Sequence, residues 1–216
     1  MSGSNPPDRM PDRMSGQAPV PWPDGKGLAF SLVVNVEEGS ELSMRDGDRG
    51  PEPVDELGVA PRRPIRSYAN ESNYAYGIKA GGPRVLDLLE RYRVQATFTA
   101  AALSLERAPD LTARVVAGGH EVCSHGWRWV HQFAMSEDEE REFIAKAVAS
   151  IESTTGRRPL GWLSRYLTTA NTARLLAEAG AEQQPGRKGP TAVAHGHFHV
   201  DEVAALTEGQ CLARLD

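Results

Sequence analysis

Two adjacent carboxylates, Glu37 and Glu38, are the residues of this sequence best suited to chemistry. They follow a short apolar run at 28–36 and precede Gly39, so they lie where a strand would end. Because like charges at close range disfavour joint ionisation, such a pair can raise the pKa of one carboxyl group. A carboxylate with a raised pKa is an effective general base near neutral pH. The alternative is a solvated turn, but the position after a buried strand favours a catalytic pair.

A regular alternation of strand-like and helix-like segments surrounds this pair. The strands are predicted at 28–36, 94–100, 120–125 and 160–164, and the helices at 83–92, 109–117, 136–155 and 171–180. The first strand is mostly apolar and β-branched, which is typical of a strand buried on both faces. Ser136 and Glu139 form a capping box for the third helix, and Gly156 ends it. This alternation predicts an α/β fold with parallel strands.

The carboxyl ends of these strands are the expected place for functional side chains, because parallel strands run into the loops there. Four residues with suitable side chains fall at such ends, namely Glu37, Glu38, His125 and Arg165. A segment rich in Gly, Pro and charge, 39–67, follows the first strand. We expect it to be a long functional loop over the top of the sheet.

The bulk composition fits one ordinary globular domain. The chain has 216 residues, of which 40% are hydrophobic and 25% are charged. Residues 1–27 are polar and proline-rich, and we expect them to form a disordered lead-in. The catalytic domain is predicted at 28–180, and a divergent tail at 181–216.

The composition also argues against several partner classes. A net charge of −5 gives no basic footprint for nucleic acid or an anionic membrane. The longest apolar stretch, 28–36, is far too short to span a bilayer, and the N-terminus lacks the apolar core of a secretion signal. Cys123 and Cys211 imply no disulfide framework. We therefore expect a cytoplasmic protein that binds neither nucleic acid nor a membrane.

Five segments, taken in order, carry a family resemblance. They are NVEEG at 35–39, ESNYAYG at 71–77, GHEVCSHGWRW at 119–129, TGRRP at 155–159 and GWLSRY at 161–166. Together they resemble the polysaccharide deacetylase-like hydrolases (carbohydrate esterase family 4), and most closely the metal-independent, allantoinase-type and cyclic-imide-type branch. The resemblance implies a distorted (β/α) barrel and hydrolysis of an amide or N-acetyl bond. It stops after Gly180, so the barrel is expected to be incomplete.

The resemblance also implies roles for the carboxylate pair. In the family, the first acid of this motif is the general base that activates water, and the second is a metal ligand. Glu37 is therefore the implied base, and Glu38 occupies the ligand position. The metal-binding members pair that acid with two histidines four residues apart, but the residue four after His125 is Trp129. Because indole is not a metal ligand, the resemblance points to hydrolysis without a cofactor.

Zinc or another divalent metal stays open as an alternative. His131 could complete a site with Glu38 and His125 if its loop folds back, although a partly exposed loop histidine is the favoured interpretation. A second histidine motif, HGHFH at 195–199, would place three imidazoles on one face of a strand. There, too, the favoured interpretation is a histidine-bearing tail.

Without a metal, positioned donors must stabilise the developing oxyanion. The candidates are His125, protonated through an expected contact with Glu38, and Arg165. Arg128 is a third option, although it could equally be a solvated loop residue. Trp127 and Trp129 are predicted to wall the pocket, although core packing explains them equally well. The full set of predicted substrate-binding residues is Glu71, Tyr74, Trp127, Arg128, Trp129 and Trp162.

Three functions from different classes remain in competition. The leading one is metal-independent hydrolysis of a small cyclic amide or ureide, with Glu37 as base and with His125 and Arg165 as electrophilic support. The second is metal-dependent deacetylation of an N-acetylated sugar. The third is a non-catalytic remnant or binding protein, because the stretch after residue 180 is too short to close a barrel. Exposed strand edges would then favour a homo-oligomer.

Overall fold

The computed structural model describes residues 30–53, 64–165 and 167–181. The chain divides into Met1–Ser31 and Leu32–Asp216, and every element named below lies in the second unit. The strands are β1 (Val33–Val36), β2 (Thr97–Ala100) and β3 (Glu121–Ser124). The helical elements are η2 (Met44–Asp46), α1 (Tyr68–Tyr76), η3 (Gly77–Gly81), α2 (Gly82–Tyr92), α3 (Ala102–Arg107), α4 (Pro109–Ala117), α5 (Glu137–Thr155) and α6 (Thr172–Ala181). The predicted lead-in, the tail and the 195–199 motif lie outside the described residues.

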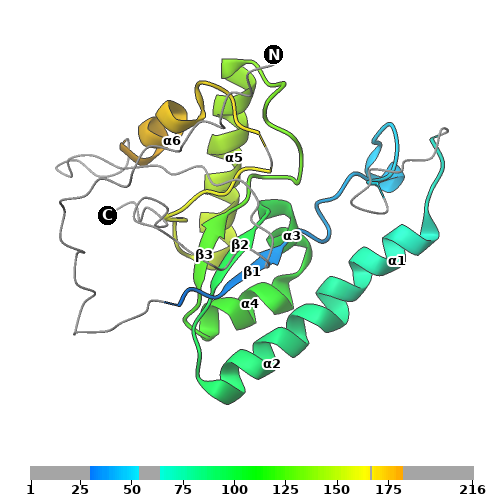
Figure 1. The fold of residues 1–216 in the computed structure, drawn as a ribbon, viewed down its shortest axis with the longest axis vertical. Coiled ribbons are helices and arrows are strands. Elements are labelled where there is room, and N and C mark those ends of the chain that lie inside the picture. Colours follow the sequence, from blue (N-terminus) through cyan, green and yellow to red (C-terminus); the bar gives the residue numbers. More distant parts are fainter. Residues whose placement is uncertain (1–29, 54–63, 166, 182–216) are drawn as a thin grey trace, which may run out of the picture. The chain divides into compact units, whose positions relative to one another are not determined.

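The three strands form a parallel sheet in the order β1-β2-β3 (Figure 1). Asn35 pairs with Thr99, and Thr99 pairs with Cys123, so the strands end level with one another. The predicted α/β fold with parallel strands is confirmed. β2 is buried along its whole length. The prediction that the first strand is buried on both faces is wrong, because β1 lies at an edge of the described sheet and Val33 is 44% exposed.

The fourth predicted strand, 160–164, is reduced to a single β-bridge between Ser124 and Trp162. The N–H of Ser124 donates to the carbonyl of Gly161 over 2.9 Å, and the N–H of Leu163 donates to the carbonyl of Ser124 over 2.8 Å. This stretch runs parallel beside β3. Arg165 comes directly after this stretch. It therefore lies at the carboxyl end of the sheet, as Glu37 and Glu38 do after β1.

The predicted helices are present as α2, α4, α5 and α6. Both hydrogen bonds of the capping box between Ser136 and Glu139 are formed at the start of α5, and Gly156 follows it with a left-handed φ of 70°. Gly180 does not end α6, which continues to Ala181. α1 and α3 were not predicted. Among the described helices, none has the length and apolar character needed to cross a membrane.

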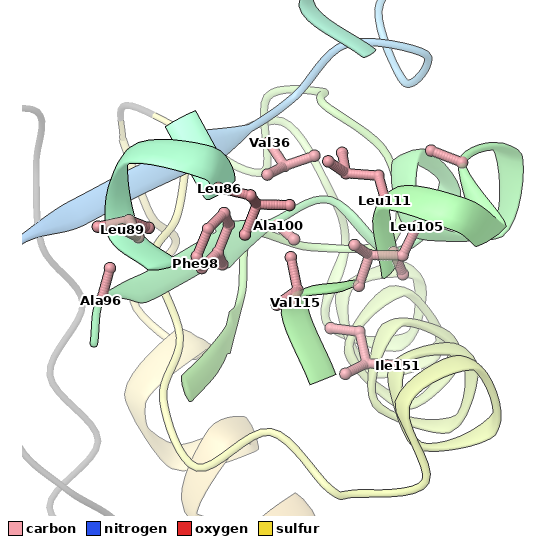
Figure 2. Packing of buried hydrophobic residues seen from close by; sticks show 12 residues of the cluster. Val36, Leu86, Leu89, Ala96, Phe98, Ala100, Leu105, Leu111, Val115 and Ile151 are labelled. Atoms are coloured by element: carbon pink, nitrogen blue, oxygen red, sulfur yellow. The ribbon is translucent and has the colours of Figure 1, made fainter. Parts of the chain in front are cut away.

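The main core lies where α2, α4 and α5 pack against the sheet. Phe98 of β2 is 1% exposed and belongs to one cluster with Leu86 of α2, Val115 of α4 and Ile151 of α5 (Figure 2). Burying an apolar side chain of this size contributes about 1.5–3 kcal/mol. This cluster packs the helices against one face of the central strand, and so it fixes the strand ends that carry the candidate site.

Candidate active site

Glu37 and His125 lie in direct contact at the carboxyl end of the sheet. Glu37 follows the last residue of β1, and His125 follows the last residue of β3. His125 Nε2 lies 3.0 Å from Glu37 Oε1. The backbone N–H of His125 donates to the carbonyl of Ala100 over 2.8 Å, which ties it to the end of β2. The His125 side chain is fully buried, whereas 17% of the Glu37 side chain is exposed, so solvent reaches the pair at the carboxylate.

Neighbouring groups fix the orientation of both side chains. Asn35 Nδ2 donates to Glu37 Oε1 over 3.2 Å, and Asn35 Oδ1 accepts from the hydroxyl of Thr99. His125 Nδ1 lies 2.6 Å from the carbonyl oxygen of Leu163. Because a carbonyl only accepts, this nitrogen carries a proton. Nε2 therefore shares a second proton with Glu37, as imidazolium beside carboxylate or as imidazole beside carboxylic acid. Such a pair can take up a proton and return it.

Glu38 lies in a different place from the one predicted. We expected Glu38 to contact His125, but the carboxylate that the structure places there is that of Glu37. The Glu38 carboxyl group lies against Gly77 at the start of η3, and its Oε2 accepts from the N–H of Glu37 over 3.2 Å. Burial raises the pKa of Glu38, and the charges of Glu37 and Glu41 raise it further, while backbone hydrogen bonds oppose the shift.

This raised pKa makes stability depend on pH. The folded state holds the Glu38 proton above the ordinary pKa of 4.5, at which the unfolded chain releases it. The folded state therefore binds more protons in that window, and its stability falls as pH rises through the folded pKa. A Glu38→Gln variant should match the wild-type melting temperature near about pH 4 and exceed it at higher pH, with a difference that stops growing once the pH passes the folded pKa. Calorimetry across this range tests the prediction, and a constant difference would contradict it.

Arg165 forms a buried ion pair with Glu52. Arg165 Nη2 lies 2.5 Å from Glu52 Oε1, and the two side chains are 7% and 3% exposed. Arg165 Nη1 donates to the carbonyl of Trp129 over 2.7 Å, and the guanidinium stacks 3.7 Å from the centre of the Trp129 ring. These contacts hold Arg165 between Glu52 and Trp129. Its predicted contribution to an oxyanion site stays a prediction.

Glu52, the ion-pair partner of the predicted site residue Arg165, was missed by sequence reasoning. Its side chain also accepts from the N–H of Leu42 over 3.2 Å, and its carbonyl accepts from Asn70 Nδ2 over 2.7 Å. It thereby joins the loop after β1 to α1 and to Arg165. A single glutamate between Pro51 and Pro53 has no spacing that points to a site.

Tyr74 and Trp129 form an aromatic wall beside the ion pair. Their ring centres lie 6.4 Å apart in an edge-on arrangement. Burial raises the pKa of Tyr74 far above its ordinary value, and the charges of nearby carboxylates, Glu52 first and also Glu37, raise it further. Tyr74 therefore keeps its phenolic proton at neutral pH.

Arg128 holds the loop that follows β1. Its guanidinium pairs with Asp48 and donates to the carbonyls of Ser40 and Glu41 over 3.3 and 2.9 Å. Burial would raise the pKa of Asp48, but the hydrogen bonds from Arg128 and from the N–H of Ser43, together with the charges of Arg128 and Arg107, lower that pKa. The donors of Arg128 are thus directed at the protein's own loop, and its predicted contact with substrate stays a prediction.

Three further predicted substrate-binding residues have contacts of a different kind. Trp162 is 7% exposed and packs in a second core cluster between α5 and α6. Trp127 packs against both core clusters. Glu71, on α1, forms a bidentate ion pair with Arg66. For the two tryptophans, core packing is the interpretation that these contacts support.

Within the described residues, His131 is not grouped with Glu38 and His125 as a metal site would require. That part of the chain holds no cluster of three or more His, Cys, Asp or Glu side chains able to bind an ion. The His131 ring lies 5.4 Å from that of Phe133, and burial, with the charge of Arg165, lowers its pKa. These donors do not fit the three protein ligands that catalytic zinc usually has.

Known proteins match a large part of the chain. A model of the polysaccharide deacetylase family matches residues 73–183. A "Putative polysaccharide deacetylase" of Schizosaccharomyces pombe is 33% identical over 163 residues, which are 73% of this chain and 51% of that protein.

Two crystal structures extend the similarity to the fold. A "probable Polysaccharide deacetylase" from Pseudomonas aeruginosa PAO1 superposes with a TM-score of 0.63 and 38% identity, and Puue allantoinase superposes with the same values. Each match covers 69% of this chain and 50% of the other protein. The chain thus spans about half the length of these relatives, as expected for part of a larger barrel.

Proposed function

This chain belongs to the polysaccharide deacetylase family, and we propose that it hydrolyses a non-peptide carbon–nitrogen bond with water activated by Glu37. The observation that supports this proposal is the contact between Glu37 Oε1 and His125 Nε2, at 3.0 Å. The hydrogen bond from His125 Nδ1 to Leu163 leaves Nε2 to exchange a proton with the carboxylate. A base with a directly attached proton relay is what amide hydrolysis needs.

The reaction follows from this pair. Glu37 takes a proton from water, and the hydroxide oxygen attacks the carbonyl carbon of the substrate amide. His125 Nε2 holds the Glu37 carboxylate during this step, and the predicted support of the oxyanion by His125 stays a prediction, because both ring nitrogens have partners in the protein. The carbon–nitrogen bond then breaks, and the proton held by the pair passes to the leaving nitrogen. The products are a carboxylic acid and an amine, so atoms and protons balance.

A small ring amide or ureide is the proposed substrate class. The position where metal-binding family members would carry the second histidine is held by Trp129, whose ring stacks under the Arg165 guanidinium. The aromatic wall of Tyr74 and Trp129 suits a flat ring. The similarity to Puue allantoinase, at 38% identity, supports the same class. Deacetylation of an N-acetylated sugar with zinc is the alternative outcome of the test.

The test is turnover by the purified chain on allantoin, a cyclic imide and N-acetylglucosamine oligomers, each with and without chelator. We expect hydrolysis of a ring substrate that chelation does not change. Activity that appears only with added zinc, or only on the sugar, would overturn the proposed substrate and mechanism. Absence of turnover on all three would support a binding protein instead.

A further inference from the structure

The elements α1, η3 and α2 form one continuous helical rod, with the π-helical turn η3 in its middle (Figure 1). π-Helical turns inside longer helices occur frequently at functional sites. Gly77 is the first residue of this turn, and the Glu38 carboxyl group packs directly against it. The contact therefore joins the rod to the candidate active site.

There is no room for a side chain at Gly77. A Cβ atom built there would lie 2.7 Å from Glu38 Cγ and 2.5 Å from Glu38 Cδ, and nearer still to Oε1. Real Cβ atoms essentially never come closer than 3.0 Å to such neighbours. The atoms in the way are all from the far end of the Glu38 side chain. A methyl group would therefore displace the carboxyl group and leave the backbone in place.

The backbone conformation does not explain the glycine. Gly77 has φ −53° and ψ −50°, which is the right-handed helical region that any residue adopts. Glycine inside a helix is unfavourable relative to alanine. Another explanation is thus required, and the packing of Glu38 supplies one.

We propose that Gly77 is a positioning residue for Glu38, whose missing side chain allows the Glu38 carboxyl group to pack against the rod and be held beside Glu37. The effect of Gly77 on turnover rests on the proposed function. The packing of Glu38 against Gly77 does not depend on that function, so packing and turnover are tested separately.

The matched control is Gly81, at the other end of the same turn. It has a similar right-handed conformation, φ −62° and ψ −57°. A Cβ atom at Gly81 would meet its nearest neighbour, on Tyr76, at 3.7 Å, which is ordinary contact. Gly81→Ala therefore changes the same turn without touching Glu38.

The experiment compares the Glu38 pKa, measured by carbon NMR, and the melting temperature in wild type, Gly77→Ala and Gly81→Ala. Gly77→Ala should lower the Glu38 pKa toward its ordinary value, because the displaced carboxyl group loses its burial. The melting temperature should not fall. Gly81→Ala should leave the Glu38 pKa unchanged. An unchanged Glu38 pKa in Gly77→Ala, or an equal shift in both variants, would overturn the proposal.

A shorter acid supplies the rescue. Where turnover is measured, Gly77→Ala should lower kcat by up to about a hundredfold, because the Glu38 carboxyl group accepts from the N–H of the base Glu37 and a misplacement of about 1 Å can cost that much. Glu38→Asp should be less damaging in the Gly77→Ala background than in wild type, because the shorter side chain avoids the methyl group. Equal cost in both backgrounds would contradict the positioning role.

Folding of the variants is itself informative. If Gly77→Ala fails to fold but Gly77→Ala/Glu38→Asp folds, the clash with Glu38 is demonstrated directly. If neither folds, the backbone requires the glycine, and the proposal is wrong. If the wild-type chain shows no turnover, the proposed function is wrong. The NMR titration of Glu38 still tests the role of Gly77 in that case.

Discussion

Replacing Glu37 with Gln is expected to lower kcat by about 10²–10⁴-fold, the usual contribution of a positioned general base. Gln keeps the size of the side chain and can still contact His125 Nε2, but it cannot take a proton from water. Asn35 and His125 both contact Glu37 Oε1, and Gln has an oxygen at the same position. The fold should therefore tolerate the change. Steady-state kinetics on the best substrate of the panel, with melting temperature measured in parallel, tests the expectation.

A matched control lies at the opposite end of the sheet. Glu121 begins β3 and accepts a hydrogen bond from Thr97 at the amino end of the strands. Glu121→Gln makes the same chemical change away from the site and should leave kcat unaltered.

The double variant Glu37→Gln/His125→Ala tests whether the two residues act together. Its kcat should fall about as much as that of the more damaging single variant, because the effects of residues that act as a unit are not additive. Unchanged turnover in Glu37→Gln would exclude it as the base.

Local signals decided which helices could be predicted. α5 has a complete capping box at Ser136 and an apolar stripe, and α4 begins with Pro109 and is followed by Gly118, so both could be predicted from neighbouring residues alone. α3 is a six-residue helix without a side-chain cap, and it forms where the chain leaves β2 and packs against α5. The edge position of β1 had no local signal, because an apolar run has the same composition in a central and an edge strand.

The candidate site was predictable to the level of strand ends and no further. Glu37 and His125 meet because level parallel strands bring their following residues together. Which of two adjacent acids faces the histidine depends on where the strand ends, since successive side chains point to opposite faces. A shift of one residue exchanges Glu37 and Glu38. The sequence therefore predicted a contact of His125 with Glu38, whereas the structure has it with Glu37. The two adjacent carboxylates themselves were identified from the sequence.

Glu52 could not be predicted in this way, because it does not lie at the end of a predicted strand. Its partner Arg165 lies 113 residues away along the chain, and only the folded loop after β1 brings the two together. Glu52→Gln removes the carboxylate and leaves a guanidinium that is buried to the same degree. We expect it to lower the free energy of unfolding by about 3–5 kcal/mol, the usual cost of breaking a buried ion pair from one side. Chemical denaturation of wild type and variant gives this difference.

Two comparison variants show how much of the lowered free energy of unfolding comes from the buried charge and how much from packing. Glu52→Leu/Arg165→Met replaces both members with apolar side chains and should recover much of the stability, because neither charge then stays buried alone. Glu71→Gln breaks the exposed pair with Arg66 and should leave unfolding unchanged, because water solvates the freed charge. If Glu52→Gln unfolded like wild type, the Glu52–Arg165 contact would not fix the loop over the site.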